Sequence, residues 1–289
     1  MSKHLPVLLD EVIQFLDPKP GGRFIDATLG AGGHTRVILD RTSPDGQVAA
    51  IDQDESALSS AREMLESFGS RLVCVHGNFR EVRAIAEAHG FTGCDGVLAD
   101  VGMSSMMVDD PSRGFSFMRE GPLDMRMDRS QPLTAAGVVN NYSEKEIADI
   151  LYMYGEERRS RPIARSIVRS RPLNLTTDLV AAIQRVTGDP RYGQIHPATR
   201  TFQALRIYVN DELKSLETFL DSSLDVVRPG GRVVVIAFHS LEDRIVKQKF
   251  RASAVPGRVL TKKVVMAVEE EVRRNPRARS AKLRAWERS

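Results

Sequence analysis

The chain has only two cysteines, Cys74 and Cys94, among its 289 residues, and it has no long apolar run. Two cysteines are too few for a disulfide framework or a zinc site, so no metal is expected. A membrane span would need about 20 consecutive apolar residues, so no membrane partner is expected either. The first residues also lack the pattern of a signal peptide. Together these absences favour a cytoplasmic protein.

The composition is otherwise that of a globular protein, with 42% hydrophobic residues and a net charge of +3. A chain of this length can hold one large domain or two modest ones. The charge is unevenly distributed along the chain. From Arg251 onward there are eleven Lys or Arg residues and four Glu residues. Such a basic segment favours nucleic acid as a partner over a small acceptor.

A glycine-rich turn lies between an apparent strand at 23–27 and a helix at 35–39. Strand, glycine turn and helix form the entry unit of a nucleotide-binding α/β sheet. Gly30, Gly32 and Gly33 allow positive φ and a close approach of a ligand to the backbone. The start of the helix then offers free N–H groups to an anionic group.

Asp52 follows the next strand, 47–51, near the roughly 20-residue spacing at which an acid can bind a ribose hydroxyl. Thr35 stands where a dinucleotide fingerprint would have its third glycine. The pattern therefore favours a nucleoside without a pyrophosphate, such as S-adenosylmethionine. Its methionyl carboxylate would lie at the glycine turn and its ribose at Asp52.

The alternation of strands and helices continues through a strand at 71–76 and a strand at 95–100. Phe79 follows the first of these, where it could pack on an adenine or simply belong to the core. Asp100 ends the second, at the edge where open α/β sheets bind ligands. Acceptors in its loop could orient an exocyclic amine for methyl transfer: Asp100, Ser104 and Ser105.

The next clear strand, 232–237, begins more than a hundred residues later, whereas a β-α-β step needs roughly thirty. We therefore predict an α/β, Rossmann-like class I methyltransferase sheet with a helical domain inserted after strand four. The predicted sheet domain comprises 1–105 and 207–289, and the predicted substrate-recognition insert comprises 106–206. A long helix from Pro197 is expected to return from the insert to the sheet.

Several features of the insert and of the last segment have two interpretations. Arginines at helical spacing could contact phosphates or form a solvated face: Arg158, Arg161, Arg165 and Arg169. A polar stripe with Arg206 and Asn210 could line a cleft or serve helix packing. Ser143 with Glu146, and Ser240 with Asp243, fit capping boxes, and Thr176 or Thr177 fits a helix cap. The segments 259–268 and 278–286 could be antiparallel strands or a disordered basic tail.

The residues after the Asp100 loop could form a wall against which an extruded cytosine stacks: Phe115, Phe117, Asp124 and Arg126. Alternatively, the two aromatic residues anchor the insert and the two charged residues form a structural ion pair. Methylation of a cytosine at C5 would need a cysteine that adds to the ring. Cys74 and Cys94 both lie away from this loop, which argues against that chemistry.

The chain resembles the family of bacterial 16S rRNA (cytosine-N4)-methyltransferases over nearly its whole length. The resemblance is carried by the segments 26–34 (DATLGAGGH), 100–105 (DVGMSS), 113–117 (RGFSF), 121–128 (GPLDMRMD), 196–204 (HPATRTFQA) and 238–244 (FHSLEDR). It implies N4-methylation of a cytidine in the decoding region, by direct in-line transfer from S-adenosyl-L-methionine without a covalent enzyme intermediate.

The resemblance also implies site residues and partners. The cofactor set is Gly30, Gly32, Gly33, His34, Asp52, Phe79, Asp100 and Met107, the last standing where a glutamine is usual. The expected substrate residues follow from their positions in the chain rather than from family contacts: Arg113, Phe115, Phe117, Asp124, Arg126, Arg200, Arg206, Asn210 and His239. The expected partners are 16S rRNA, within the small ribosomal subunit, and a second copy of the chain in a homodimer. Two alternatives remain: an RNA-binding assembly factor on a methyltransferase scaffold, and a methyltransferase that acts on DNA or protein.

Overall fold

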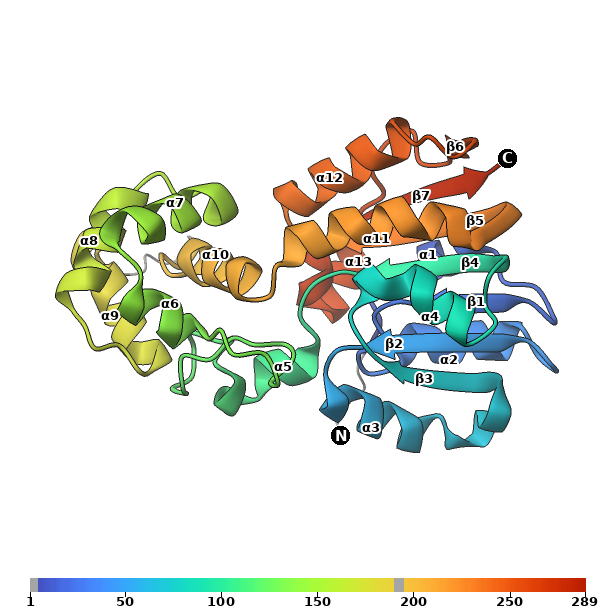
Figure 1. Ribbon diagram of the computed structural model, residues 1–289, viewed down its shortest axis with the longest axis horizontal. Helices are drawn as coiled ribbons and strands as arrows, with labels where there is room; N and C mark the ends of the chain where they lie inside the picture. The colour runs from blue at the N-terminus through green and yellow to red at the C-terminus, as the bar shows by residue number, and fades with distance from the viewer. Residues whose placement is uncertain (1–4, 190–194) are drawn as a thin grey trace. The chain divides into compact units, whose positions relative to one another are not determined.

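The computed structural model describes residues 5–189 and 195–289, and it divides into two compact units (Figure 1). The first unit runs up to Gly102 and resumes at Leu213–Ser289, and the second comprises Met103–Glu212. These limits lie a few residues from the predicted domain boundaries. Among the described residues, no helix is long and apolar enough to cross a membrane.

The first unit is built on a seven-stranded sheet with the order β3-β2-β1-β4-β5-β7-β6. Its strands are β1(Arg23–Asp26), β2(Gln47–Asp52), β3(Leu72–His76), β4(Cys94–Asp100), β5(Val227–Ala237), β6(Gly257–Val259) and β7(Lys282–Arg288). The strands β1 to β5 are parallel, and β7 pairs antiparallel with both β5 and β6. The order reverses between β1 and β4, as in doubly wound sheets. The predicted Rossmann-like α/β class is confirmed.

Helices cover both faces of this sheet. One face carries α1(Leu9–Leu16), α2(Gly33–Arg41) and α3(Glu55–Met64), and the other carries α4(Val82–Ala88), α11(Glu212–Val226) and α12(Ser240–Arg251). Alternate strand residues enter the two cores, since Phe24, Ala50 and Leu98 pack with the first group of helices. Their neighbours Ile25, Ala49 and Val97 pack with the second. The parallel strands are therefore apolar on both sides, which explains their nearly continuous hydrophobic runs.

The C-terminal segment forms part of the sheet, so the alternative of a disordered tail is wrong. The antiparallel pairing was predicted, but the strands are shorter and shifted, and α13(Glu269–Arg274) lies between them. The ladder between β5 and β7 pairs Val233 with Trp286 and Val235 with Arg284. Trp286 is 1% exposed. The basic residues of this segment therefore lie in a structured part of the sheet domain.

The second unit is helical and has its own hydrophobic core. Its helices are α5(Ser105–Asp109), α6(Ala135–Asn141), α7(Glu144–Gly155), α8(Ser160–Arg169), α9(Thr176–Thr187) and α10(Thr199–Val209). The capping box of Ser143 and Glu146 begins α7 as predicted. The predicted threonine cap of α9 is wrong, because Thr176 is already helical and its hydroxyl donates to the carbonyl of Arg119 at 2.9 Å.

The single long helix predicted from Pro197 is also wrong. The chain leaves helical geometry after Val209, and Asp211 adopts a left-handed conformation with φ 48°. Asn210 is the C-cap of α10, and α11 begins at Glu212. An apolar stripe continues through this break, which is why helical periodicity alone does not reveal it.

Candidate functional site

Three strands of the sheet end in a carboxylate on the same face. Asp26, Asp52 and Asp100 are the last residues of β1, β2 and β4, which are neighbours in the sheet. Each lies two residues beyond a side chain that packs with α1, α2 and α3. Because side chains alternate along a strand, the three carboxylates point to that same face. They gather at the carboxyl end of the strands, where ligands bind in this class of sheet.

The glycine turn is fixed to Asp52 by a hydrogen bond from a backbone N–H to the side-chain carboxylate. The N–H of Gly30 donates to one Asp52 oxygen at 2.8 Å, and the N–H of Asp54 donates to the other at 2.9 Å. Gly30 and Gly32 have φ 50° and 75°, which only glycine adopts without strain. Gly33 then begins α2. A carboxylate has about four acceptor sites, so Asp52 keeps capacity for hydroxyl donors. Burial raises the pKa of Asp52, although these hydrogen bonds oppose the shift.

Asp26 is a component of the site that the sequence reasoning did not assign. It is 1% exposed, and it accepts hydrogen bonds from the hydroxyl of Thr35 at 2.6 Å and the N–H of Thr28 at 3.1 Å. Thr28 in turn accepts from the N–H of Asp100 at 2.6 Å. Burial, followed by the charge of Asp52, raises the pKa of Asp26 to about 7. The strand predicted from the sequence extends to Ala27, so Asp26 stood inside it, whereas the structure ends β1 at Asp26.

Asp100 presents the unsatisfied group of the cluster. Its Oδ1 is buried and has no hydrogen-bond partner among the described residues, and its Oδ2 lies 3.9 Å from Nδ1 of His34. His34 Nε2 donates to the carbonyl of Val7 at 3.0 Å, so Nδ1 carries the lone pair in the neutral ring. Burial lowers the pKa of His34 to about 4. Burial, then the charges of Asp26 and Glu242, raises the pKa of Asp100 to about 8.

These residues fit S-adenosyl-L-methionine and a substrate amine. Asp52 offers acceptors to vicinal hydroxyls, and the turn around Gly32 brings backbone close without a side chain. An unpartnered buried carboxylate oxygen costs free energy unless a donor reaches it, and Asp100 Oδ1 is such an atom. A ligand that brings N–H donors or positive charge to this face would satisfy it.

Phe79 follows β3 and is partly buried. Its ring meets Phe219 of α11 edge to face, with centroids 5.3 Å apart. It packs against the core that includes Val82 and Ile85 of α4. These contacts support the interpretation that Phe79 belongs to the core. Because part of the side chain is exposed, a contact with adenine stays a prediction.

Within the insert, two predicted substrate residues brace the backbone of the segment 125–131. Arg113 is 5% exposed and donates to the carbonyls of Arg126 and Met127 at 3.1 and 2.8 Å. Asn210 accepts from the N–H of Met127 at 2.7 Å and donates to the carbonyl of Met125 at 2.8 Å. Both side chains are committed to protein groups, so their role in this geometry is to shape the loop.

The charged pairs of the insert are also internal. Arg126 binds Asp124 through two hydrogen bonds of 2.8 Å, which is the structural ion pair considered from the sequence. Burial opposes ionisation, but the hydrogen bonds and charge of Arg126 outweigh it and lower the pKa of Asp124. Arg206 binds Glu212 with the same two-point geometry. Arg200 is exposed, and one guanidinium nitrogen lies 3.5 Å from the carbonyl of Glu156.

The two aromatic residues of the RGFSF segment differ in accessibility. Phe115 is 6% exposed and belongs to the core of the insert, so neither ring face is open for stacking. Phe117 is partly buried, with its ring stacked on His196 at 4.5 Å and edge-on to Phe202 at 5.4 Å. Of the predicted wall, only Phe117 retains exposed aromatic surface.

The loop after Asp100 is used partly for capping. Ser104 precedes α5 and accepts from the N–H of Met107 at 3.3 Å. The side chain of Met107 is 3% exposed and packs in the insert core. The backbone N–H of Met107 is therefore already bonded to Ser104. The Met107 side chain is enclosed in the insert core, so it is not placed to contact a cofactor. Ser105 is the first residue of α5, and its side chain lies outside the described part.

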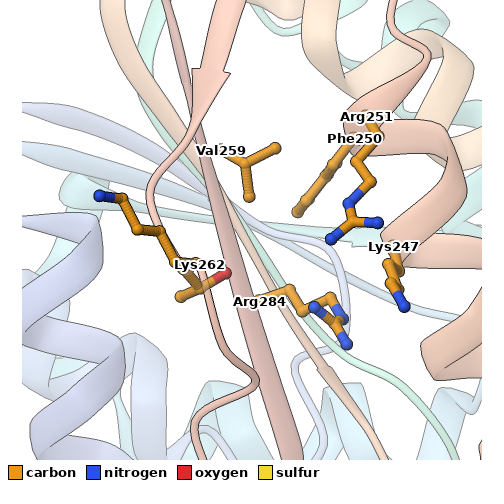
Figure 2. Close-up of a pocket in the computed structure, with 7 residues that line it drawn as sticks. Lys247, Phe250, Arg251, Val259, Lys262 and Arg284 are labelled. Carbon is orange, nitrogen blue, oxygen red and sulfur yellow. The ribbon is translucent and has the colours of Figure 1, made fainter.

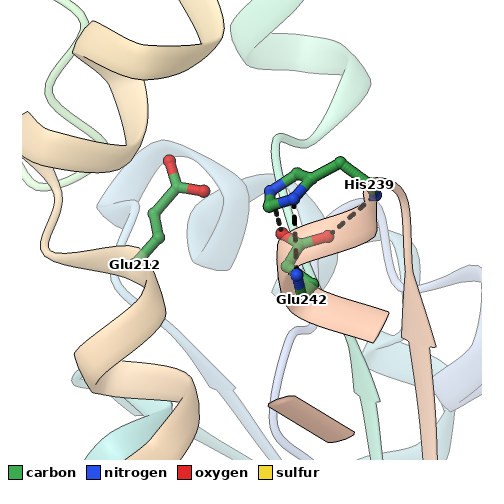
Figure 3. Close-up of side chains that lie close together, drawn as sticks. All are labelled: Glu212, His239 and Glu242. Atoms are coloured by element: carbon green, nitrogen blue, oxygen red, sulfur yellow. Dashed lines mark hydrogen bonds and ion pairs between the residues drawn. The ribbon is translucent and has the colours of Figure 1, made fainter. Parts of the chain in front are cut away.

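The capping box predicted for α12 is formed by other residues than expected. The residue before this helix is His239, whose Nδ1 accepts from the N–H of Glu242 at 3.4 Å (Figure 3). Glu242 reciprocates by accepting from the N–H of His239 at 3.3 Å, and it also accepts from the N–H of Phe238 at 2.8 Å. The box is therefore formed by His239 and Glu242 rather than Ser240 and Asp243. The second ring nitrogen of His239 lies 3.0 Å from Glu242, so the imidazole is held at the sheet edge.

The arginine stripe is smaller than the sequence indicated. Arg158 precedes α8 and does not belong to the helix. Arg165 has an acidic partner, because its Nε lies 3.3 Å from Glu144. At this position the interpretation as a solvated face, with an ion pair to a neighbouring helix, is the one that the structure supports. Arg161 and Arg169 are exposed and have no ion-pair partner among the described residues.

Comparison with known proteins matches the whole chain, residues 1–289, to the model of the MraW methylase family. The chain is 50% identical over 307 residues to ribosomal RNA small subunit methyltransferase H of Thermomicrobium roseum, covering 99% of this chain and 94% of that protein. It is 53% identical over 287 residues to the protein of the same name from Nostoc sp., covering 98% and 92%.

The fold comparison is weaker, as expected for distant proteins. The crystal structure of PH0851 aligns with a TM-score of 0.50 at 14% identity, covering 97% of this chain and 45% of that chain. A likeness at this identity supports the α/β fold and carries no conclusion about substrate.

Proposed function

The chain belongs to the MraW methylase family, and we propose that it methylates the N4 amine of a cytidine in the decoding region of 16S rRNA. The methyl donor is S-adenosyl-L-methionine, which supplies a methyl group activated by a sulfonium centre. The fold is the Rossmann-like sheet of class I methyltransferases. The observation that supports the chemistry most directly is Asp100 Oδ1 at the carboxyl end of β4, which is buried and has no hydrogen-bond partner among the described residues.

Asp100 suits an exocyclic amine better than a ring carbon. A carboxylate that accepts an amine N–H turns the nitrogen lone pair toward the incoming methyl group. As the N–C bond forms, the bond between sulfur and the methyl carbon would break and leave the neutral thioether S-adenosylhomocysteine. The nitrogen would then carry the positive charge and must release a proton. A carboxyl group with a pKa of about 8 can take that proton near neutral pH.

The cysteines support direct transfer without a covalent intermediate. Cys94 begins β4, is fully buried, and burial raises the pKa of its thiol to about 12. Cys74 lies inside β3, and burial raises its pKa as well. A reactive cysteine needs a lowered thiol pKa, and the pKa is raised in both residues.

The insert is proposed to recognise the RNA. Phe117 offers the exposed part of its ring for stacking. Arg161 and Arg169, which have no ion-pair partner in the described part of the chain, offer their charges to phosphates. Arg113, Asp124, Arg126 and Asn210 would act indirectly, by fixing the loop between them. With ribosomal RNA as the substrate, the protein is expected to act in the cytoplasm.

The proposed reaction is tested by incubating the protein with labelled donor and small-subunit particles taken at successive assembly stages. Nucleoside analysis of the recovered rRNA should show label in N4-methylcytidine from the decoding region. RNA binding without label would instead support an assembly factor that has lost catalysis. Label that enters DNA or protein but not rRNA would contradict the proposed substrate.

The rate of methyl transfer should rise with pH. The pKa of Asp100 is raised to about 8, so the carboxyl is mostly neutral at pH 6 and mostly ionised at pH 9. Because the ionised form accepts the amine proton, kcat/KM, which reports the pKa values of the free enzyme, should increase through this interval and then level off. Asp100→Asn should be slow and lack this rise. A wild-type rate that falls between pH 6 and pH 9 would exclude Asp100 as the proton acceptor.

A further inference from the structure

A separate site, lined by basic residues, lies between α12 and the strands β6 and β7, away from the carboxylate cluster. It is a cavity of about 330 Å³. Its lining residues are Lys247, Phe250 and Arg251 of α12, Val259 of β6, Thr261 and Lys262 after it, and Arg284 of β7 (Figure 2). This volume is near the lower end of the range for ligand sites, roughly 300–1,000 Å³, which suits one nucleotide unit rather than a large cofactor.

Arg284 is the fixed element of this cavity. It is a buried charged residue, 8% exposed, and it pairs with Asp243 through contacts of 2.7 and 3.2 Å. These contacts use its Nε and one terminal nitrogen. The other terminal nitrogen, Nη1, has no hydrogen-bond acceptor among the described residues. A guanidinium held by a carboxylate on one side and free on the other is preorganised to bind an anion.

Two further cations face the same space from α12. Lys247 and Arg251 are four residues apart, so they lie on one side of the helix. Both are exposed, and neither has an ion-pair partner in the described part of the chain. Figure 2 shows their charged ends near that of Arg284, whereas Lys262 points away from the three. Like charges at this spacing repel one another, and an anion between them would relieve the repulsion.

The surrounding surface strengthens such an interaction. Phe250 and Val259 form an apolar side of the cavity, and Phe250 is 3% exposed. Apolar walls exclude water and lower the effective dielectric, so charges attract more strongly there than on an open surface. Within 5–189 and 195–289, Arg284 is the only one of the three convergent cations with a carboxylate partner, so the cavity keeps an excess of positive charge.

The position of the cavity connects it to the carboxylate cluster. Arg284 pairs with Val235 on β5, and Val235 pairs with Ala99, the neighbour of Asp100 on β4. Two strand spacings correspond to about 10 Å. The side chain of Arg284 points to the opposite face from Asp100, because it alternates with Leu283 and shares a face with Trp286. The two sites thus lie at nearby positions along the strands but on opposite faces.

We propose that this cavity binds a phosphodiester of the RNA substrate and holds the strand across the carboxyl edge of the sheet. The proposal rests on the proposed function for its choice of RNA. A phosphate offers several acceptor oxygens and a negative charge, which match Nη1 of Arg284 and the free cations of Lys247 and Arg251. The contact is independent of sequence, so it would contribute to affinity and register rather than to base choice.

The test measures binding of a single-stranded oligonucleotide with the decoding-region sequence to the full chain at several salt concentrations. Lys247→Gln and Arg251→Gln should each weaken binding, and the slope of log affinity against log salt should become shallower by about 0.7. Lys263→Gln is the matched control, because Lys263 is exposed, basic and outside the cavity. It should leave the slope at the wild-type value, and unchanged binding of S-adenosyl-L-methionine by all three variants would show that they fold.

Slopes equal to wild type in both cavity variants, or an equal decrease in Lys263→Gln, would overturn the proposal. A loss of inorganic phosphate binding without a change in the RNA slope would assign the cavity to a small anion and also overturn it. The methylation assay is read separately. If the wild type methylates rRNA and the slopes do not move, only the cavity proposal fails. If the slopes move but no rRNA is methylated, the proposed reaction fails and the phosphate site stands.

Discussion

Asp100→Ala is expected to reduce the single-turnover rate of methyl transfer about a hundred-fold or more when the donor is saturating. The variant removes the acceptor that orients the amine and takes its proton. A displacement of reacting groups by about 1 Å can alone cost roughly a hundred-fold. Asp100 Oδ1 has no partner among the described residues, so its loss breaks no hydrogen bond that holds the protein together. Saturating donor ensures that weaker cofactor binding does not imitate a chemical defect.

The matched controls are Cys74→Ser and Cys94→Ser. Neither thiol is placed or ionised to attack a base, so both variants should retain nearly the wild-type rate if they fold. Circular dichroism would establish folding, because Cys94 is buried and a buried hydroxyl can destabilise the core. Full activity in Asp100→Ala, or a lost chemical step in a folded cysteine variant, would refute direct transfer assisted by Asp100.

Asp52→Ala is expected to weaken donor binding by about ten- to a hundred-fold. The substitution removes the charge-assisted acceptor proposed for the ribose hydroxyls, and such a bond contributes roughly 1.5–3 kcal/mol. It also releases the N–H of Gly30, which now donates to Asp52 at 2.8 Å. Isothermal titration calorimetry with S-adenosyl-L-methionine measures the effect directly.

Asp54→Asn provides the comparison for that measurement. Asp54 caps α3 by accepting from the N–H of Ser56 at 3.1 Å, and asparagine caps helices equally well. The variant therefore removes a neighbouring negative charge while preserving the local structure. Its donor affinity should stay within a few-fold of wild type. Equal affinities for wild type and a folded Asp52→Ala protein would show that Asp52 does not hold the donor.

The sheet could be predicted from the sequence because its signals are local. Each parallel strand is a short apolar run between turn residues, and glycines mark the approach to the helix that follows β1. Asp52 and Asp100 were found because acids that follow such runs must lie at the carboxyl edge. The same rule missed Asp26, because the apolar pattern extends the predicted strand to Ala27 and so places Asp26 inside it rather than at its end.

The roles of the insert residues could not be predicted, because they depend on contacts between distant segments. Arg113 and Asn210 look like free polar groups until the loop 125–131 is folded against both of them. The pairing of Arg165 with Glu144 joins two helices and has no sequence periodicity. The break at Asp211 is a backbone feature that an uninterrupted apolar stripe conceals.

The insertion after β4 also determines the order in which the two cores can be completed during synthesis. The partner of β4 on one side is β5, which leaves the ribosome more than a hundred residues after Asp100. At about 5–20 residues per second, β4 remains an unpaired edge for roughly 5–25 s. Every residue of the insert core is translated within that interval. The helical unit therefore has all of its core residues before the sheet receives its fifth strand. During that interval the apolar edge of β4 is open, and the nascent chain must keep it from pairing with other chains.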